Sequence, residues 1–311
     1  MKRTIEELLE HSGELVRKFR APAGKKVRLT DYDPAWAGDE DVPKKQRKAI
    51  AAELLTQQVD ALAKAQELLY ASDTWSLLII LQAMDAAGKD GTIKHVMSGV
   101  NPQGCQVYSF KQPSAEELDH NFLWRCWKAV PERGRIGIFN RSYYEEVLVV
   151  RVHPAFLAAQ RLPEQKFDDA FWQGRYDDIN NFERHLTHNG TAVLKFFLHV
   201  SKEEQRERFI ARLEDPEKHW KFSAKDVAER AYWDDYMRAF EDAIGATSTE
   251  WAPWYVIPAD HKWVSRALVA NIIASTIRSL DLEYPKIDDE KRTEIEIARR
   301  TLDEEKPANA S

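Results

Sequence analysis

The segment LLIILQAMDAAGKDGTIK, Leu77–Lys94, carries the strongest structural signal in the chain. An apolar run of strand character leads into a short loop that contains Gly88 and Lys89, and a helical pattern follows directly. This order predicts a phosphate-binding loop, because backbone N–H groups and the positive end of the helix dipole then face the anion, and a lysine reaches the outer phosphates. We assign phosphate binding to Ala86, Ala87, Gly88, Lys89, Asp90, Gly91 and Thr92.

The match to the strict loop pattern G-x-x-x-x-G-K-[ST] is incomplete. Ala83 stands in place of the first glycine, and Asp90 stands in place of the metal-binding hydroxyl residue. An ordinary strand-to-helix turn with a solvated lysine is therefore the alternative. Asp85 and Asp90 bracket Lys89, which suits a phosphate that arrives with Mg²⁺, because Mg²⁺ binds carboxylates together with phosphate oxygens. We predict that Asp85 and Asp90 hold Mg²⁺, or Mn²⁺ in its place.

The composition is that of a soluble globular protein: of 311 residues, 43% are apolar and 31% are charged. The net charge of −6 argues against general nucleic-acid binding, so a polyanionic ligand would need a local basic channel. Cys105 and Cys126 fit no metal-binding spacing, and two cysteines form no disulfide framework. We therefore expect both thiols to be reduced, as in the cytosol. No apolar run approaches the ~20 residues of a membrane span, and the N-terminus lacks a signal-peptide core. We expect a cytoplasmic protein with no nucleic-acid or membrane partner.

Strand-like and helical segments alternate along the chain, which predicts a doubly wound parallel α/β sheet of the P-loop kinase type. This domain is expected to span residues 44–285, after an irregular lead-in at 1–43 with one short amphipathic helix and before a charged tail at 286–311. A capping box at Ser114 predicts one helix that continues through Trp127. The main helix is expected at 44–70, and the five strands are expected at 75–81, 107–110, 135–140, 192–200 and 254–257.

A cluster of functional residue types, Asn140–Glu146, follows the third predicted strand. Ligands of open α/β sheets bind beyond the carboxyl ends of the strands, so the cluster is expected beside the phosphate loop. A helix N-cap at Asn140 or Ser142 with first-turn glutamates is the alternative, but it leaves Arg141 near the positive end of a helix, where a cation is disfavoured. We therefore predict that Arg141 clamps a phosphate with two parallel hydrogen bonds.

A second capping box, Ser201–Glu204, begins a helix in which Arg208 and Arg212 share one face. A proline-containing loop with Lys218 and Lys221 follows, and then another helix. Two short helices around a basic loop, over residues 201–235, are typical of a lid that brings positive charge to a transferring phosphoryl group. A surface helical hairpin with scattered basic residues is the alternative. We assign Arg208 and Arg212 to catalysis and Lys218 and Lys221 to phosphate binding.

Several segments together resemble the family-2 polyphosphate kinases over about residues 20–285. They are MDAAGKDG (Met84–Gly91), FKQPS (Phe110–Ser114), FLWR (Phe122–Arg125), FNRSYYEE (Phe139–Glu146), the lid stretch Ser201–Trp233 and APWYVIPADHKW (Ala252–Trp263). The resemblance implies a fold similar to thymidylate kinase. It also implies Mg²⁺-dependent phosphoryl transfer between inorganic polyphosphate and a nucleotide.

Many members of that family have an aspartate where this chain has Asn140, which leaves more of the metal coordination to Asp85. The form NRSYYEE resembles the subgroup that accepts both nucleoside mono- and diphosphates, which implies AMP, ADP and ATP as partners, with guanosine nucleotides as further candidates. We place Lys111 and Arg125 in the nucleotide or polyphosphate walls and Glu145 near the acceptor nucleotide. Apolar helices such as 44–70 are consistent with a dimer or tetramer, although core packing explains them equally well.

Two other functions fit the same residues. An ATP-dependent nucleotide kinase of the thymidylate-kinase type would share the loop and the lid and would differ in its phosphoryl donor. A protein that binds polyphosphate or nucleotide without turnover would need no metal ligands, so the paired aspartates count against it.

Overall fold

The computed structural model describes residues 12–38, 42–163 and 166–305, and these contain a five-stranded parallel sheet in the order β2-β3-β1-β4-β5. The central strand β1 pairs with β3 on one side and with β4 on the other. All seven residues of β1 are buried, as the continuous apolar run predicted. The strands are β1 (Ser76–Gln82), β2 (Cys105–Ser109), β3 (Ile136–Asn140), β4 (Thr191–His199) and β5 (Trp254–Pro258).

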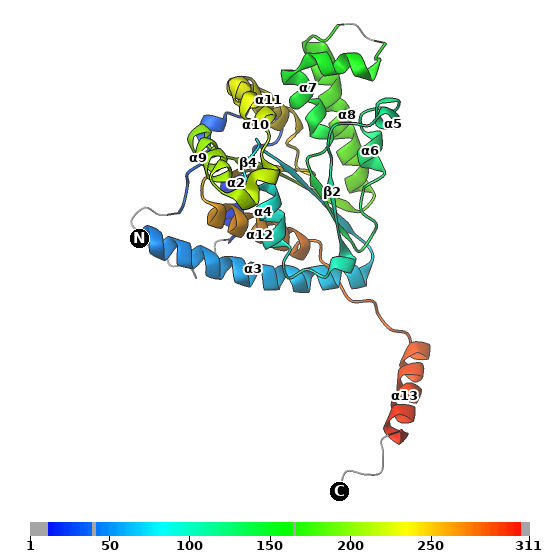
Figure 1. Cartoon of the computed structure of the whole chain (residues 1–311). Coiled ribbons are helices and arrows are strands. Elements are labelled where there is room, and N and C mark those ends of the chain that lie inside the picture. The colour runs from blue at the N-terminus through cyan, green and yellow to red at the C-terminus, as the bar shows by residue number, and fades with distance from the viewer. Residues whose placement is uncertain (1–11, 39–41, 164–165, 306–311) are drawn as a thin grey trace.

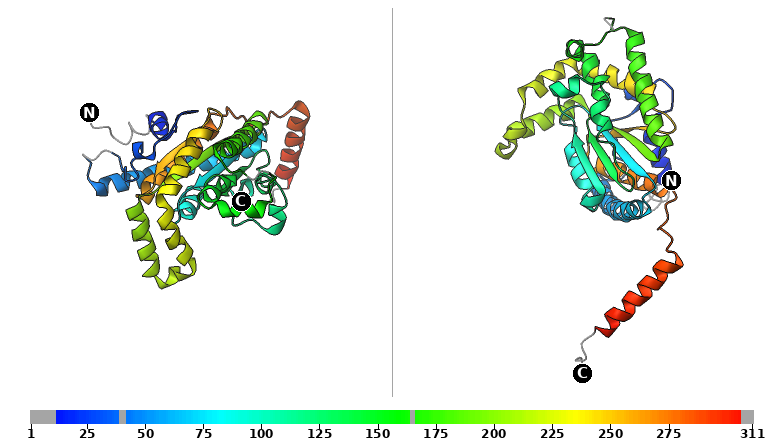
Figure 2. Two further views of the ribbon diagram at one scale, coloured as in Figure 1. Left: turned by 90° about the horizontal axis from the view of Figure 1, so that it is seen from above. Right: turned by 90° about the vertical axis from the view of Figure 1, so that its right-hand side faces the viewer.

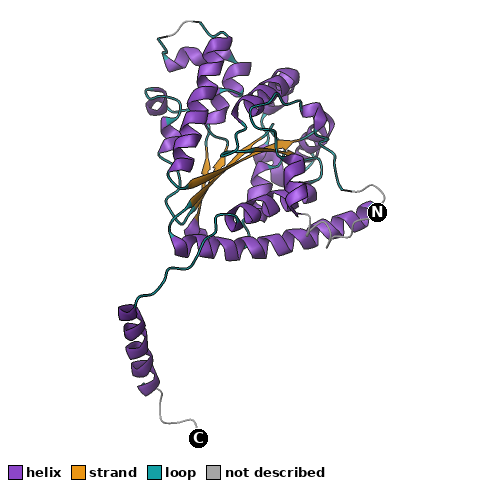
Figure 3. Ribbon diagram, turned by 180° about the vertical axis from the view of Figure 1, so that it is seen from behind, coloured by secondary structure: helices purple, strands orange, loops and turns teal. Residues whose placement is uncertain are grey.

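Helices cover both faces of this sheet, so the predicted doubly wound α/β fold is confirmed (Figures 1 and 3). One face carries α3 (Lys44–Ser72), α4 (Lys89–Val96) and α12 (Lys262–Arg278), and the other carries α8 (Asp169–His188) and α11 (Trp233–Thr247). The long helix α3 coincides with the predicted helix 44–70. Its buried positions include Leu62 and Leu69, which belong to the hydrophobic core of the chain.

The connection from β2 to β3 differs from the single helix predicted there. The Ser114 capping box is present, but α5 (Ala115–Leu118) is one turn long and α6 (Trp124–Trp127) is a separate turn. The Asn121 side chain accepts a hydrogen bond from the Leu123 N–H at 3.1 Å, and this local bond replaces the helical one. The remaining short elements between α4 and α8 are η2 (Pro102–Gly104), η3 (Tyr143–Glu146), α7 (Val149–Val152) and η4 (Pro154–Gln160).

The lead-in contributes to the core, whereas the sequence predicted an irregular surface segment. After α2 (Ser12–Phe19), the Ala21 N–H donates to the Trp254 carbonyl at 2.9 Å, and Arg20 forms an antiparallel bridge with Tyr255. The segment thus covers the outer edge of β5, which would otherwise expose unpaired backbone groups. Val27 and Leu29, the latter in η1 (Leu29–Asp31), are also buried. The predicted amphipathic helix falls partly on residues 1–11, outside the described residues.

A helical hairpin projects from the body at the position of the predicted lid (Figure 2). It consists of α9 (Lys202–Leu213), η5 (Pro216–Lys221), α10 (Ala224–Ala228) and η6 (Glu229–Tyr232). Half of the predicted capping box is present: the Glu204 N–H donates to the Ser201 hydroxyl, while the Glu204 carboxylate accepts from Arg208.

The tail forms α13 (Asp289–Glu304), which lies away from the sheet with every residue exposed (Figure 1). Across the described part of the chain, no helix combines the length and apolar character needed to cross a membrane.

Candidate active site

The phosphate loop and the Asn140–Glu146 cluster lie side by side because β1 and β3 are neighbours whose register places Leu81 opposite Asn140. Both segments line a cleft of about 900 Å³, together with the lid and the first turns of α12. The acidic side chains of the lining are Asp85, Asp90 and Asp226. The basic ones are more numerous: Lys89, Lys111, Arg141, Arg208, Arg212, Lys218, Lys262 and Arg266. The cleft is therefore a local basic channel in an acidic protein, as a polyanionic ligand requires.

The loop before α4 has the geometry of an anion cradle. Gly88 is the N-cap of α4 with φ of +109°, a conformation that glycine adopts without strain. The Lys89 ammonium donates to the carbonyls of Ala83 at 2.9 Å and Met84 at 3.4 Å. Burial lowers the pKa of Lys89, and the neighbouring Arg141 lowers it further, against the opposing effect of Asp85. A phosphate bound here would stabilise the charged lysine.

Arg141 lies in the left-handed backbone region, with φ of +63°, and its side chain is paired with two carboxylates. Its guanidinium lies 2.7 Å from Asp85 and 3.6 Å from Glu145. Glu145 does not line the cleft, and its side chain is 16% exposed. Desolvation raises the pKa of its carboxyl, against the opposing charge of Arg141. Glu145 thus pairs with Arg141 at the edge of the cleft, and its contact near the acceptor nucleotide stays a prediction.

Asp85 and Asp90 are suited to a metal ion that arrives with phosphate. Within the described ranges, no group of three or more His, Cys, Asp or Glu side chains is arranged to hold a metal, so the protein alone forms no cage. Asp85 is paired with Arg141, and Asp90 accepts a hydrogen bond from the Asn140 amide at 2.8 Å. Mg²⁺ commonly binds one or two carboxylates and completes its octahedron with phosphate oxygens and water, which fits this donor set.

Arg208 and Arg212 are four residues apart on α9, but their surroundings differ. All five N–H donors of Arg208 are engaged: Nε donates to Glu204 at 2.8 Å, and the terminal nitrogens donate to backbone carbonyls. Arg212 and Lys218 line the cleft. The Lys221 side chain lies outside the described part of the chain. The carbonyl partners of Arg208 belong to Ala86, Ala87, Ala259 and Asp260.

Lys262 and Arg266 of α12 are basic cleft residues that were not predicted from the sequence. Burial lowers the pKa of both side chains, and the nearby positive charge of Arg208 lowers both further. Such a cluster of cations is stabilised when an anion binds. The signal was available, since the two residues lie four apart immediately after the fifth strand, where ligands of open sheets bind. Other cleft residues that were missed are Ser109, Phe110, Gln112, Ala211, Trp220, Asp226 and Ser265.

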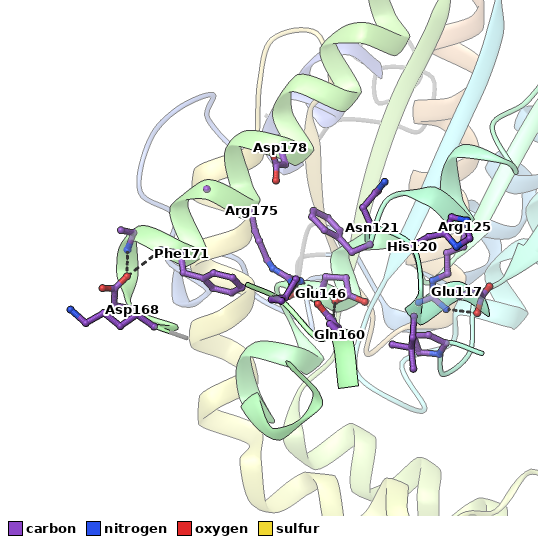
Figure 4. A pocket seen from close by; sticks show the side chains of 17 residues that line it. Glu117, His120, Asn121, Arg125, Glu146, Gln160, Asp168, Phe171, Arg175 and Asp178 are labelled. Carbon is purple, nitrogen blue, oxygen red and sulfur yellow. Dashed lines mark hydrogen bonds and ion pairs between the residues drawn. The ribbon is translucent and has the colours of Figure 1, made fainter. Parts of the chain in front are cut away.

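A second pocket, of about 660 Å³, lies between the α5–α6 segment, η4 and α8 (Figure 4). Arg125 lines this pocket rather than the cleft and donates to the carbonyl of Lys111 at 2.7 Å. Lys111 lines the cleft, so this hydrogen bond connects the linings of the two cavities.

The Arg175 guanidinium lines the second pocket and contacts two aromatic rings and two polar side chains. Its charge centre is 4.8 Å from the Phe122 ring and 5.0 Å from the Phe171 ring. Its nitrogens contact Glu146 at 2.9 Å and Gln160 at 2.6 Å. Burial lowers the pKa of Arg175, and Glu146 opposes that effect. The pocket therefore combines flat apolar rings with hydrogen-bonding groups, as sites for small organic ligands commonly do.

A phosphate loop, a basic cleft and paired carboxylates at the carboxyl edge of a parallel sheet define a phosphoryl-transferring enzyme of the P-loop kinase class. The model of the family described as Polyphosphate kinase 2 matches residues 44–285. The chain therefore belongs to the polyphosphate kinase 2 family.

Individual relatives agree with this assignment. The chain is 53% identical over 291 residues to an ADP-polyphosphate phosphotransferase of Rhodopseudomonas palustris, covering 92% of this chain and 98% of the relative. It is 46% identical over 271 residues to an AMP/ADP-polyphosphate phosphotransferase of Meiothermus ruber, covering 87% and 96%. The crystal structure of Polyphosphate Kinase 2 from Arthrobacter aurescens superposes with a TM-score of 0.81 at 42% identity, covering 91% of this chain and 96% of that one.

Proposed function

We propose that this kinase moves phosphoryl groups between inorganic polyphosphate and adenosine mono- and diphosphates, in either direction. The observation that carries the proposal is the basic cleft around Lys89. Its lining extends to Lys262 and Arg266 of α12, and it is linked by the Arg125–Lys111 hydrogen bond to a second pocket that we assign to the nucleoside. The two relatives described above, one an ADP and the other an AMP/ADP phosphotransferase, support the same acceptors.

Positioning and charge neutralisation carry this reaction, because the attacking group is an already ionised phosphate oxygen and needs no general base. Lys89 and the loop amides hold the phosphate at the reacting centre. Arg141 leaves its pairing with Asp85 to clamp a second phosphate bidentately. Arg212 and Lys218 approach from the lid side of the cleft.

Asp85 would hold Mg²⁺, with Asp90 as the second ligand, since the Asn140 amide already occupies one oxygen of Asp90. When bound, the metal neutralises charge on the phosphoryl oxygens. Competition between the cation and Arg141 for Asp85 would release the guanidinium toward the phosphates, so loading of metal and substrate is expected to be cooperative.

The two cavities divide the substrates. The polyphosphate chain follows the wall formed by Lys262 and Arg266, while the nucleoside of the acceptor enters the pocket beside Phe122. Arg125 and Lys111 stand between the two, where the acceptor phosphates cross from one cavity to the other.

A donor assay tests this proposal. Purified protein is supplied with Mg²⁺ and either AMP or ADP, with polyphosphate alone or ATP alone as the donor, and the nucleotides are separated by chromatography. The proposal predicts ADP and ATP formation with polyphosphate as the only donor. Phosphorylation of AMP by ATP, with none by polyphosphate, would instead identify an ATP-dependent nucleotide kinase.

A further inference from the structure

Two side chains of α9, Gln205 and Arg208, donate hydrogen bonds to the phosphate loop. The Gln205 amide, which is 1% exposed, donates to the carbonyl of Asp85 at 2.9 Å. One terminal nitrogen of Arg208 donates to the carbonyls of Ala86 at 3.1 Å and Ala87 at 2.7 Å. Three successive carbonyls of the loop are therefore bound to one helix.

These bonds fix the direction of the loop's N–H groups. In a trans peptide the N–H points opposite to the C=O, and the described residues contain no cis peptide bond. With the Asp85 carbonyl turned toward Gln205, the Ala86 N–H points away from α9; with the Ala87 carbonyl turned toward Arg208, the Gly88 N–H does the same. The Ala87 N–H is used within the loop, donating to Met84 at 3.3 Å. Ala86 and Gly88 both line the cleft, where an anion would accept from them.

The backbone of Ala86 supports this interpretation. Its φ is +62°, a conformation uncommon for a residue with a Cβ atom, which persists where surrounding contacts enforce it. Gln205 binds the Asp85 carbonyl, in the peptide before Ala86, and Arg208 binds the Ala86 carbonyl, in the peptide after it. Together these two bonds supply that constraint.

The two side chains are themselves anchored by different elements of the fold. Arg208 also donates to the carbonyls of Ala259 at 2.6 Å and Asp260 at 3.1 Å, at the junction of β5 and α12. Gln205 accepts from Arg230 of η6 at 2.6 Å, and Arg230 donates to the carbonyl of Lys202 at 2.9 Å. The loop is thus tied to the β5–α12 junction through Arg208 and to η6, the returning helical turn of the lid, through Gln205.

We propose that Gln205 and Arg208 are positioning residues: they aim the N–H groups of Ala86 and Gly88 at the bound phosphate and do not themselves contact the phosphoryl group in transfer. This replaces the phosphoryl contact that the sequence predicted for Arg208, because every N–H donor of Arg208 already has a protein acceptor. The inference rests on the proposed function for its kinetic consequences, while its binding consequences are independent of turnover.

Amide-resolved NMR of the full chain with sodium tripolyphosphate tests the assignment. In the wild-type protein, tripolyphosphate is expected to shift the amide resonances of both Ala86 and Gly88. Gln205→Leu should remove most of the Ala86 shift and retain the Gly88 shift. Arg208→Met should remove most of the Gly88 shift and a smaller part of the Ala86 shift, because Arg208 also bonds to the Ala86 carbonyl. Equal loss of both shifts in either variant, or retention of both, would overturn the proposal.

Kinetics supply the second measurement, with Phe209→Leu as the control, since Phe209 is a buried α9 residue without a hydrogen bond to the loop. We expect Gln205→Leu to lower kcat about tenfold, less than the loss of a direct transition-state donor, with KM for ADP within threefold of wild type. Phe209→Leu should lower the Tm at least as much and keep kcat. Equal losses of kcat in Gln205→Leu and Phe209→Leu would show that Gln205 acts only through the stability of α9, and would contradict its role in positioning the loop.

Arg208→Lys separates charge from geometry, because lysine keeps the charge and loses the planar fork. The proposal expects Arg208→Lys to remain as impaired as Arg208→Met, and full recovery would contradict it. A wild-type protein that binds tripolyphosphate but shows no turnover with polyphosphate would defeat the proposed function, and the NMR comparison would still decide the roles of Gln205 and Arg208.

Discussion

The phosphate cleft and the second pocket are neighbouring cavities that are built in different ways. The cleft takes its shape from backbone and from charged residues at the ends of parallel strands, so short contiguous segments supply most of it. The pocket depends on Glu146, Gln160 and Arg175, side chains that come from three separate elements and meet only in the folded chain. Under the proposed function, the cleft recognises charge, which every phosphate shares, while the pocket recognises a particular shape. Catalysis and nucleotide choice should be separable by mutation.

The largest effect is expected from Lys89→Ala, which removes the central cation of the cleft. We expect a loss of about 2–4 kcal/mol of transition-state stabilisation, a fall in kcat of roughly 30- to 1,000-fold, as for removal of one preorganised donor. Steady-state assays with ADP and polyphosphate measure it. Lys94→Ala, in the same helix but outside the cleft lining, is the matched control and should retain activity. Activity of Lys89→Ala within a few-fold of wild type would remove Lys89 from the mechanism.

Arg141→Lys should have the next largest effect. Lysine preserves the charge but cannot form the two parallel bonds of a guanidinium, so kcat/KM is expected to fall about 10- to 100-fold. Arg135→Lys serves as the control, because Arg135 makes an exposed ion pair with Glu132 outside the cleft. If Arg141→Lys and Arg135→Lys behave alike, Arg141 does not clamp a phosphate.

Phe122→Leu tests the pocket. Aromatic stacking of a base is worth about 1–3 kcal/mol, so KM for ADP should rise about 5- to 100-fold, with little change in inhibition by tripolyphosphate. Phe156→Leu makes the same substitution at a half-exposed residue of η4 outside the pocket lining and should leave KM unchanged. An unchanged KM in Phe122→Leu would place the nucleoside elsewhere.

The smallest effect concerns stability and pH at Glu145. Burial raises the pKa of this carboxyl above its unfolded value, so the folded state binds the proton more tightly and its stability falls as pH rises through that interval. The neutral variant Glu145→Gln should therefore have a higher Tm than wild type at neutral pH, and the gap should close as the solution is acidified. Thermal unfolding over a pH series measures this difference. A gap that widens on acidification would show that the pairing with Arg141 outweighs burial.

The sequence was sufficient for the features that depend on local pattern. The apolar run ending at Leu81 identified the central strand, and Gly88–Lys89 identified the phosphate loop. The rule that ligands bind at the carboxyl ends of parallel strands correctly brought Asn140 and Arg141 to that loop, because β1 and β3 are paired in register.

Features that depend on distant partners were not predictable in this way. Helical spacing placed Arg208 and Arg212 on one face of α9, but it could not show that Arg208 donates to backbone carbonyls of the phosphate loop and of the β5–α12 junction. Lys195 is a further case: it lies in the predicted fourth strand and is fully buried, with its charge paired at 2.5 Å to Glu183 of α8. Nothing in the local pattern identifies such a partner, since the pairing exists only after the helix packs on the sheet.

The division between the two cavities is tested most directly by calorimetric titration of wild type, Lys89→Ala and Phe122→Leu with two ligands, tripolyphosphate and adenosine. Tripolyphosphate has no nucleoside, and adenosine has no phosphate, so each reports on one cavity. The account predicts that Lys89→Ala loses tripolyphosphate binding and keeps adenosine binding, while Phe122→Leu weakens adenosine and keeps tripolyphosphate. Equal weakening of both ligands in both folded variants would contradict it and would mean that the cleft and the pocket act as a single site.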